Sequence, residues 1–183
     1  MTLSPYPPEF ISYLAEYFGS RDYFECHELM EELWKKEKGS PSEGSWLVLV
    51  RIAVAQYHAR RGNGRGAYKL LAKAAEEADP GELGRIGLDG AKLVAMLRER
   101  VAAWGGPDGV FYAEFELPIA DPLLLRLAQE RCAARGWAWG APAEAIPSEV
   151  VHRHATRDRS EVVAARAEAA EARAKARARS RPD

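Results

Sequence analysis

The chain has 183 residues, 26 basic and 27 acidic side chains, and a formal net charge of −1 at pH 7. Its length fits one domain with appendages, since single domains usually have roughly 100–200 residues. A net charge so close to zero creates no overall electrostatic field that would attract nucleic acid or an anionic membrane. Cys26 and Cys132 form no CxxC pair that would indicate a zinc knuckle or a disulfide framework.

The apolar runs argue against export and membrane insertion. Residues 1–10 lack the basic and apolar stretches of a secretory signal. The longest apolar run, 46–57, includes Arg51 and Gln56 and is too short to cross a bilayer. We therefore expect a cytoplasmic protein with no membrane partner.

Apolar residues recur at intervals of three and four through the first half of the chain, which is the spacing of helices that bury one face. A first helix is predicted at 10–18 and a second at 23–38. Asp22 is placed to cap the second helix and Gly39 to end it. Residues 40–44 form a predicted loop.

The third predicted helix, at 45–61, is apolar almost all round, so it belongs in the middle of a bundle. Asn63 is placed to cap a fourth helix at 65–78. The chain breaks at Pro80-Gly81, and a fifth helix follows Asp89. Five short helices with short connections predict an all-α fold, a small up-and-down helical bundle over residues 8–104.

Residues 105–147 are predicted to form an extension packed on this core. The 110–117 segment fits either a short strand or an extended stretch. A further helix is predicted at 121–135, because an Asp-Pro pair suits a helix start. The following loop carries Trp137 and Trp139, which we expect to lie against the bundle.

Residues 148–183 are rich in Ala, Arg and Glu, with high helix propensity and no apolar stripe wide enough to dock. They predict a polar tail that is helical or disordered. Its 173–181 stretch holds five basic residues and no acidic one. We interpret this stretch as solvated, with weak nucleic-acid contact as the alternative; no other nucleic-acid binding is expected.

The second predicted helix carries the most informative cluster. At about 100° per residue, its apolar residues share one arc that must face the core. His27 lies at the edge of that arc and Glu31 lies just beyond it. Glu28 and Glu32 are one turn apart on the outer face, where two carboxylates repel unless a cation or a proton lies between them.

An antiparallel pairing of the second and third helices predicts the neighbours of this cluster. With a turn near residue 41, the numbers of paired residues sum to roughly 83. His27 would then lie within a turn of His58, and Glu28 within a turn of Arg51. A buried guanidinium needs a partner, and we expect Glu28 or Glu32 to pair with Arg51.

Three interpretations of the cluster stay open. In the first, His27, Glu31 and His58 bind a divalent metal such as zinc, manganese or iron. In the second, His27, Glu28 and Glu31 are candidate catalytic residues, with His27 as general base. An anionic ligand would then be bound by Arg51, His58, Arg61 and Asn63.

In the third interpretation the cluster is structural: His27 and Glu31 share a rim hydrogen bond, and Arg51 is a buried counter-ion. The spacing resembles the HExxH zinc motif only in part, because Glu31 stands at the position of the second histidine. Residue types alone leave the three interpretations open.

Two motifs in order carry a resemblance to a known family. These are the 23–34 run Tyr-Phe-Glu-Cys-His-Glu-Leu-Met-Glu-Glu-Leu-Trp, and the 53–63 run with Arg65-Gly66-Ala67 after it. Together they resemble the prokaryotic domain of unknown function 309 family over about residues 8–104. The positions that match the family motifs are His27, Glu28, Glu31, Trp34, His58, Arg61, Gly62 and Asn63.

This resemblance implies a compact all-helical domain and no established activity. A polar uncharged residue is usual in the family where this chain has Arg51, and a guanidinium there would compete with a cation for Glu28. Two hypotheses follow. One is a binding or enzymatic site at the cluster, with metal-assisted hydrolysis as its chemistry. The other is a non-catalytic interaction module, such as a homodimer, with exposed aromatic residues Tyr6, Tyr17 and Trp137.

Overall fold

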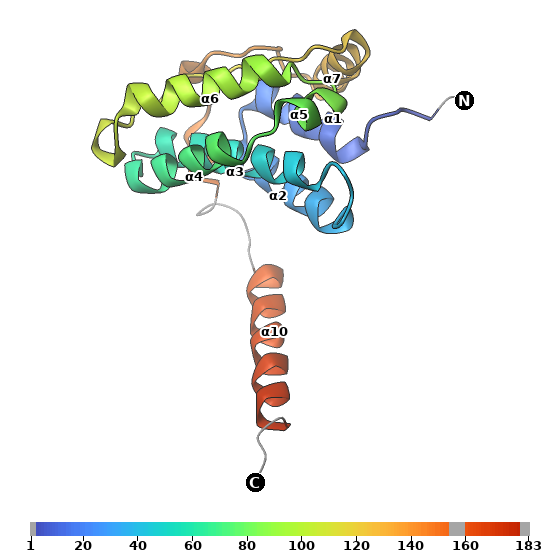
Figure 1. Cartoon of the computed structure of the whole chain (residues 1–183), viewed down its shortest axis with the longest axis vertical. Helices are drawn as coiled ribbons and strands as arrows, with labels where there is room; N and C mark the ends of the chain where they lie inside the picture. Colours follow the sequence, from blue (N-terminus) through green and yellow to red (C-terminus); the bar gives the residue numbers. More distant parts are fainter. Residues whose placement is uncertain (1–2, 154–159, 180–183) are drawn as a thin grey trace. The chain divides into compact units, whose positions relative to one another are not determined.

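A computed structural model describes residues 3–153 and 160–179. Their regular structure is helical apart from one isolated bridge, which confirms the all-α class (Figure 1). The chain divides into two compact units, one up to His152 and one from Arg153. The α-helices of the first unit are α1 (Pro8–Ala15), α2 (Tyr23–Lys36), α3 (Glu43–Arg60), α4 (Gly64–Glu77), α5 (Pro80–Arg85), α6 (Gly90–Trp104), α7 (Pro122–Ala134) and α8 (Ser148–Val151). The division into core, extension and tail at residues 104 and 147 stays a prediction, which limited proteolysis would test.

Polar side chains cap the starts of four helices, as the sequence predicts. Asp22 accepts a backbone N–H of the first turn of α2 at 3.0 Å, and Asn63 does the same for α4 at 3.0 Å. Asp89 and Asp121 cap α6 and α7 in the same way. Each such cap satisfies a backbone donor that has no partner inside its helix.

Helix α3 lies in the middle of the first unit. Helices α2 and α4 both pack against α3, while α1 packs on α2 and α7, and α6 packs on α4. Trp46, Leu49 and Ile52 of α3 are buried, which confirms the prediction from its apolar sequence. Burial of each such side chain contributes about 1.5–3 kcal/mol to stability.

Two local features differ from the predicted helices. Helix α1 continues as a π-helix over Glu16–Ser20, after which Arg21 has a left-handed backbone with φ of 56°. Helix α5 forms where the sequence predicts only a break. Pro80 takes the first position of α5, where its missing N–H is not needed, and Asp79 caps that turn.

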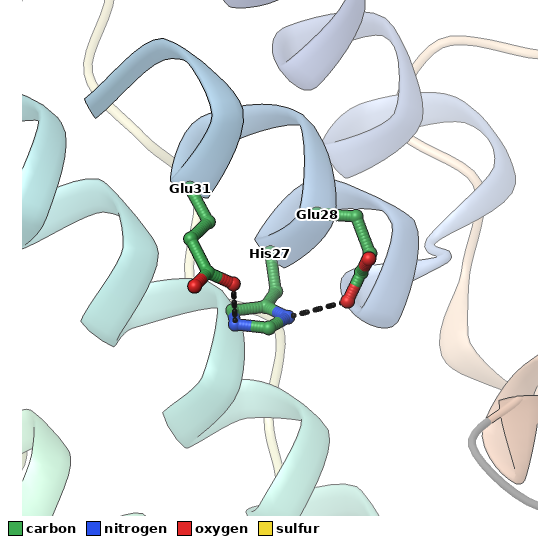
Figure 2. Close-up of side chains that lie close together, drawn as sticks. All are labelled: His27, Glu28 and Glu31. Atoms are coloured by element: carbon green, nitrogen blue, oxygen red, sulfur yellow. Dashed lines mark ion pairs between the residues drawn. The ribbon is translucent and has the colours of Figure 1, made fainter. Parts of the chain in front are cut away.

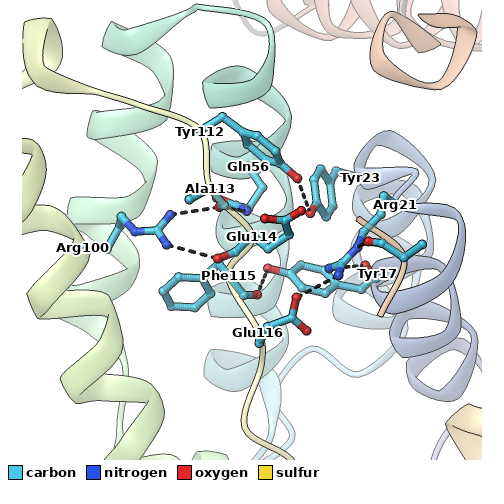
Figure 3. A network of polar contacts seen from close by, with 11 residues as sticks. Tyr17, Arg21, Tyr23, Gln56, Arg100, Tyr112, Ala113, Glu114, Phe115 and Glu116 are labelled. Atoms are coloured by element: carbon cyan, nitrogen blue, oxygen red, sulfur yellow. Dashed lines mark hydrogen bonds and ion pairs between the residues drawn. The ribbon is translucent and has the colours of Figure 1, made fainter. Parts of the chain in front are cut away.

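The 110–117 segment is extended and is not a strand of a sheet. Among the described residues no strand runs beside it, and bundle side chains hold it instead. Gln56 donates to the carbonyl of Ala113 at 3.1 Å, and Tyr17 donates to that of Phe115 at 2.6 Å. Figure 3 shows these bonds together with those of Arg100 to two carbonyls of the same segment.

The loop after α7 lies against the bundle, as predicted. The ring of Trp139 stacks on that of Phe18, with 4.4 Å between the centroids. Tyr17, however, is fully buried, so the prediction that it offers an exposed aromatic surface is wrong. Its hydroxyl instead donates a hydrogen bond to the carbonyl of Phe115 in the 110–117 segment.

Helix α10 (Ser160–Arg179) belongs to the second unit. Every side chain described in it, at 167–179, is exposed to solvent. Residues 154–159 and 180–183 of the predicted tail lie outside the described part. Among the described helices, none is both long enough and apolar enough to span a membrane.

Candidate metal centre

Helix α2 has a buried apolar arc, and polar and acidic side chains lie next to it on the same helix. Cys26, Met30 and Leu33 of this helix are buried in the core. His27 and Glu31 lie one turn apart at the edge of that arc, and both are partly exposed. The local helical period therefore places the two side chains beside each other.

The imidazole of His27 lies between two carboxylates, as Figure 2 shows. Its Nδ1 is 3.3 Å from Oε1 of Glu28, and its Nε2 is 3.1 Å from Oε2 of Glu31. We call these three residues the His27 cluster. Each offers one ligand atom, and the three atoms lie within 4.8 Å of one another. Their side chains are 27%, 33% and 33% exposed, so an ion could reach them from solvent.

One aromatic ring and one basic side chain lie beside the cluster. The ring of Phe24 lies 6.1 Å from that of His27, and the ring of Tyr57 on α3 lies 5.8 Å from that of Phe24. Lys35 binds the second oxygen of Glu31 at 2.7 Å. One oxygen of Glu31 is thus neutralised by a cation while the other faces the imidazole.

His58 is not among the three residues of this ligand group. Its Nδ1 is 3.1 Å from the amide nitrogen of Asn63, whose oxygen accepts the N–H of Gly66 as the cap of α4. Among the described residues, the structure places Glu28 in the ligand group in place of His58. The sequence identified Glu28 as a catalytic candidate but did not indicate that its carboxylate would contact the imidazole of the neighbouring His27.

Arg51 pairs with Glu77 of α4, so the prediction that it pairs with Glu28 or Glu32 is wrong. The predicted pairing of helices is confirmed, since Trp46 of α3 donates to Glu37 at the end of α2. The error concerns the direction of the side chain. Arg51 points from α3 toward α4, and burial lowers its pKa from the ordinary value.

The observed ion pair decides which substitution should leave Arg51 without a partner. Glu77→Ala should cost about 2 kcal/mol of unfolding free energy, because it leaves the mostly buried Arg51 guanidinium without its partner. Glu28→Ala should change stability by less than about 0.5 kcal/mol, because it removes only a partly exposed contact with His27. Urea unfolding of both variants measures the difference, and a larger cost for Glu28→Ala would contradict the observed pairing.

The four residues predicted to bind an anion make different contacts. Arg51 is bound to Glu77, while His58 and Asn63 contact each other at the junction of α3 and α4. The guanidinium of Arg61 lies over the ring of Tyr57, 5.0 Å from its centroid. The structure therefore brings together His27, Glu28 and Glu31, and leaves the basic residues distributed over α3 and its end.

Comparisons with known proteins find one family model and one similar protein whose matches cover the region of the candidate site. A family model described as "Domain of unknown function (DUF309)" matches residues 11–70, which include the His27 cluster. The chain is similar to "Uncharacterized protein YpuF" of Bacillus subtilis (strain 168), with 33% identity over 169 residues that cover 88% of this chain and 92% of that protein. No solved structure matches the chain significantly.

Proposed function

Since the chain belongs to the domain of unknown function 309 family, whose description names no activity, we propose a function from the site itself: binding of a divalent first-row transition metal by His27, Glu28 and Glu31. The observation that carries the proposal is that one ligand atom from each of one imidazole and two carboxylates lies within 4.8 Å of the other two on α2. These ligand types suit zinc, manganese and iron.

The spacing of the donors supports this assignment. Ligand atoms about 2.1 Å from a tetrahedral ion lie about 3.4 Å from one another. The two carboxylates face different nitrogens of His27, Glu28 at 3.3 Å from Nδ1 and Glu31 at 3.1 Å from Nε2. An ion bound at one nitrogen would therefore find one carboxylate at ligand spacing, and the other carboxylate would have to rotate toward that ion. A cation would also relieve the repulsion between the carboxylates of Glu28 and Glu31.

Three protein ligands would leave coordination positions for water or a small molecule. Structural zinc sites normally use four protein ligands, whereas catalytic sites keep an open position. Metal-assisted hydrolysis is the chemistry that such an open position allows. Binding also requires a deprotonated imidazole, so acid should weaken it.

Metal analysis of the purified full chain tests the proposal. After equilibrium dialysis against Zn²⁺ or Mn²⁺, we expect one bound ion per chain, measured by mass spectrometry of the metal. His27→Ala and Glu31→Gln should each weaken binding at least tenfold, because each removes one of three ligands. Glu32→Gln is the matched control, since this neighbouring glutamate is exposed and outside the ligand group.

A second candidate function is an interaction module in which the cluster is structural. It is favoured by the contacts that the cluster already makes, since His27 faces a carboxylate at each nitrogen and Glu31 also binds Lys35. This candidate predicts a metal-free protein that elutes as a dimer and keeps its dimer in the His27→Ala variant. Absence of stoichiometric metal at neutral pH would overturn the metal proposal.

A further inference from the structure

Helix α10 presents an exposed surface with an unusual distribution of charge. It has 20 residues, and the side chains described in it, at 167–179, are all exposed. Alanine is the only apolar residue type among them. A helix that lies in a membrane interface needs large apolar side chains on one face, so the composition of residues 167–179 does not fit insertion into a lipid surface.

The C-terminal part of α10 carries cations on two opposite sides. Arg173, Lys175, Arg177 and Arg179 alternate with alanine, and no acidic residue lies among them. At about 100° per residue, Arg173 and Arg177 are about 40° apart on one side of the helix. Lys175 and Arg179 form a second pair rotated by about 200° from the first. The four positions span only about 9 Å along the helix axis.

This arrangement fits a groove that has phosphates on both walls. The major groove of B-DNA is about 12 Å wide and accepts a helix, while the major groove of A-form RNA is too narrow for side chains to read. Alanine between the cations lets the backbone approach closely. We propose that α10 binds duplex DNA in its major groove, through phosphate contacts on both sides and without preference for base sequence.

The acidic residues of α10 oppose this binding only in part. Lys175 binds Glu171 at 3.0 Å, with side chains 69% and 67% exposed. A pair so exposed is worth little and is screened by salt, so a phosphate can compete for the lysine. Glu168 and Glu171 both precede Arg173 in the chain, so the segment that follows Glu171 is uniformly cationic.

Fluorescence anisotropy with a labelled duplex DNA tests the proposal on the full chain. With four phosphate contacts, the logarithm of the binding constant should fall with that of the salt concentration at a slope of about −3.6. This slope lowers affinity on the order of 100-fold between 50 and 200 mM salt. The fourfold variant should lose at least tenfold in affinity, and circular dichroism should show unchanged helix content. This variant combines Arg173→Gln, Lys175→Gln, Arg177→Gln and Arg179→Gln.

A matched control shows whether a loss of DNA affinity comes from this surface of α10 or from the loss of positive charge in general. Lys69, Lys92, Arg98 and Arg126 are exposed cations of the first unit, and their joint replacement by Gln changes the net charge equally. This control should bind DNA as the wild type does. Equal losses in the two variants would overturn the proposal. So would tighter binding of single-stranded RNA, duplex RNA or phosphatidylserine vesicles than of duplex DNA under the same conditions.

Discussion

Replacement of Glu16 by glutamine is expected to stabilise the protein at pH 8 and to leave its stability almost unchanged at pH 4.5. Glu16 is 9% exposed, and burial raises the pKa of its carboxyl from the ordinary value of 4.5 to about 7. A shift of this size corresponds to about 3 kcal/mol. The glutamine variant should gain up to that amount at pH 8, where the wild type must bury a charge.

The direction of this pH dependence follows from the raised pKa. The folded protein holds the proton of Glu16 more tightly than the unfolded chain, so the stabilisation is complete below pH 4.5. It is lost as the pH rises through about 7. The hydrogen bond from Ser20 lowers the pKa, the carboxylates of Asp22 and Glu25 raise it, and Arg135 lowers it.

Urea unfolding of wild type and variant at both pH values measures the effect. The difference between the two proteins is the relevant quantity, because other carboxylates also respond to acid. Lys36 lowers the pKa of Glu9 mainly through a hydrogen bond, so their contact weakens in acid in both proteins alike. Glu99→Gln, on the exposed side of α6, is the control and should give no pH-dependent difference. Equal stabilisation by Glu16→Gln at pH 4.5 and pH 8 would contradict the assignment.

The sequence predicts the helices well because their signals are local. A cap such as Asp22 or Asn63 acts on a backbone N–H three residues away, and the apolar period reports the buried face within one helix. The His27 to Glu31 contact is predictable for the same reason, since both lie on one turn of α2. Local signals therefore account for the bundle and for the core of the candidate site.

Features that depend on the direction of a side chain between helices could not be predicted. Arg51 lies on the central helix, and a one-dimensional pairing of α2 with α3 does not say that it turns toward Glu77 of α4. The same holds for His58, which the pairing of helices predicts to lie within a turn of His27. Its Nδ1 contacts the side-chain amide of Asn63, at the junction of α3 and α4. For both residues, the pairing of helices leaves the direction of the side chain undetermined.

The π-helix and the residue that follows it could not be predicted either, because tertiary contacts define them. Arg21 has a left-handed backbone, a conformation that costs a residue with a Cβ roughly 1–2 kcal/mol. Its side chain is only 1% exposed. The buried guanidinium donates to the carbonyl oxygens of Ala141 and Tyr17 at 3.0 and 3.2 Å, and to Glu116 at 2.8 Å. It thereby links the π-helix, the 110–117 segment and the loop after α7.

Arg21→Ala is therefore expected to destabilise the protein by about 3–4 kcal/mol, because it leaves buried carbonyl oxygens without donors and keeps the unfavourable backbone conformation. Arg21→Gly should be less harmful by about 1 kcal/mol, since glycine adopts a positive φ readily. Glu116→Gln is the control for the ion pair. It should cost less than about 1 kcal/mol, because the Glu116 side chain is 51% exposed.

Denaturant unfolding of the three variants, together with hydrogen exchange of the 110–117 segment, measures these effects. Faster exchange in Arg21→Ala than in Glu116→Gln is expected if the guanidinium holds the segment through the π-helix and the loop as well as through the ion pair. A cost for Arg21→Ala within about 1 kcal/mol of that for Glu116→Gln would contradict this. The ion pair alone would then explain the role of Arg21, and its two carbonyl contacts would contribute little to stability.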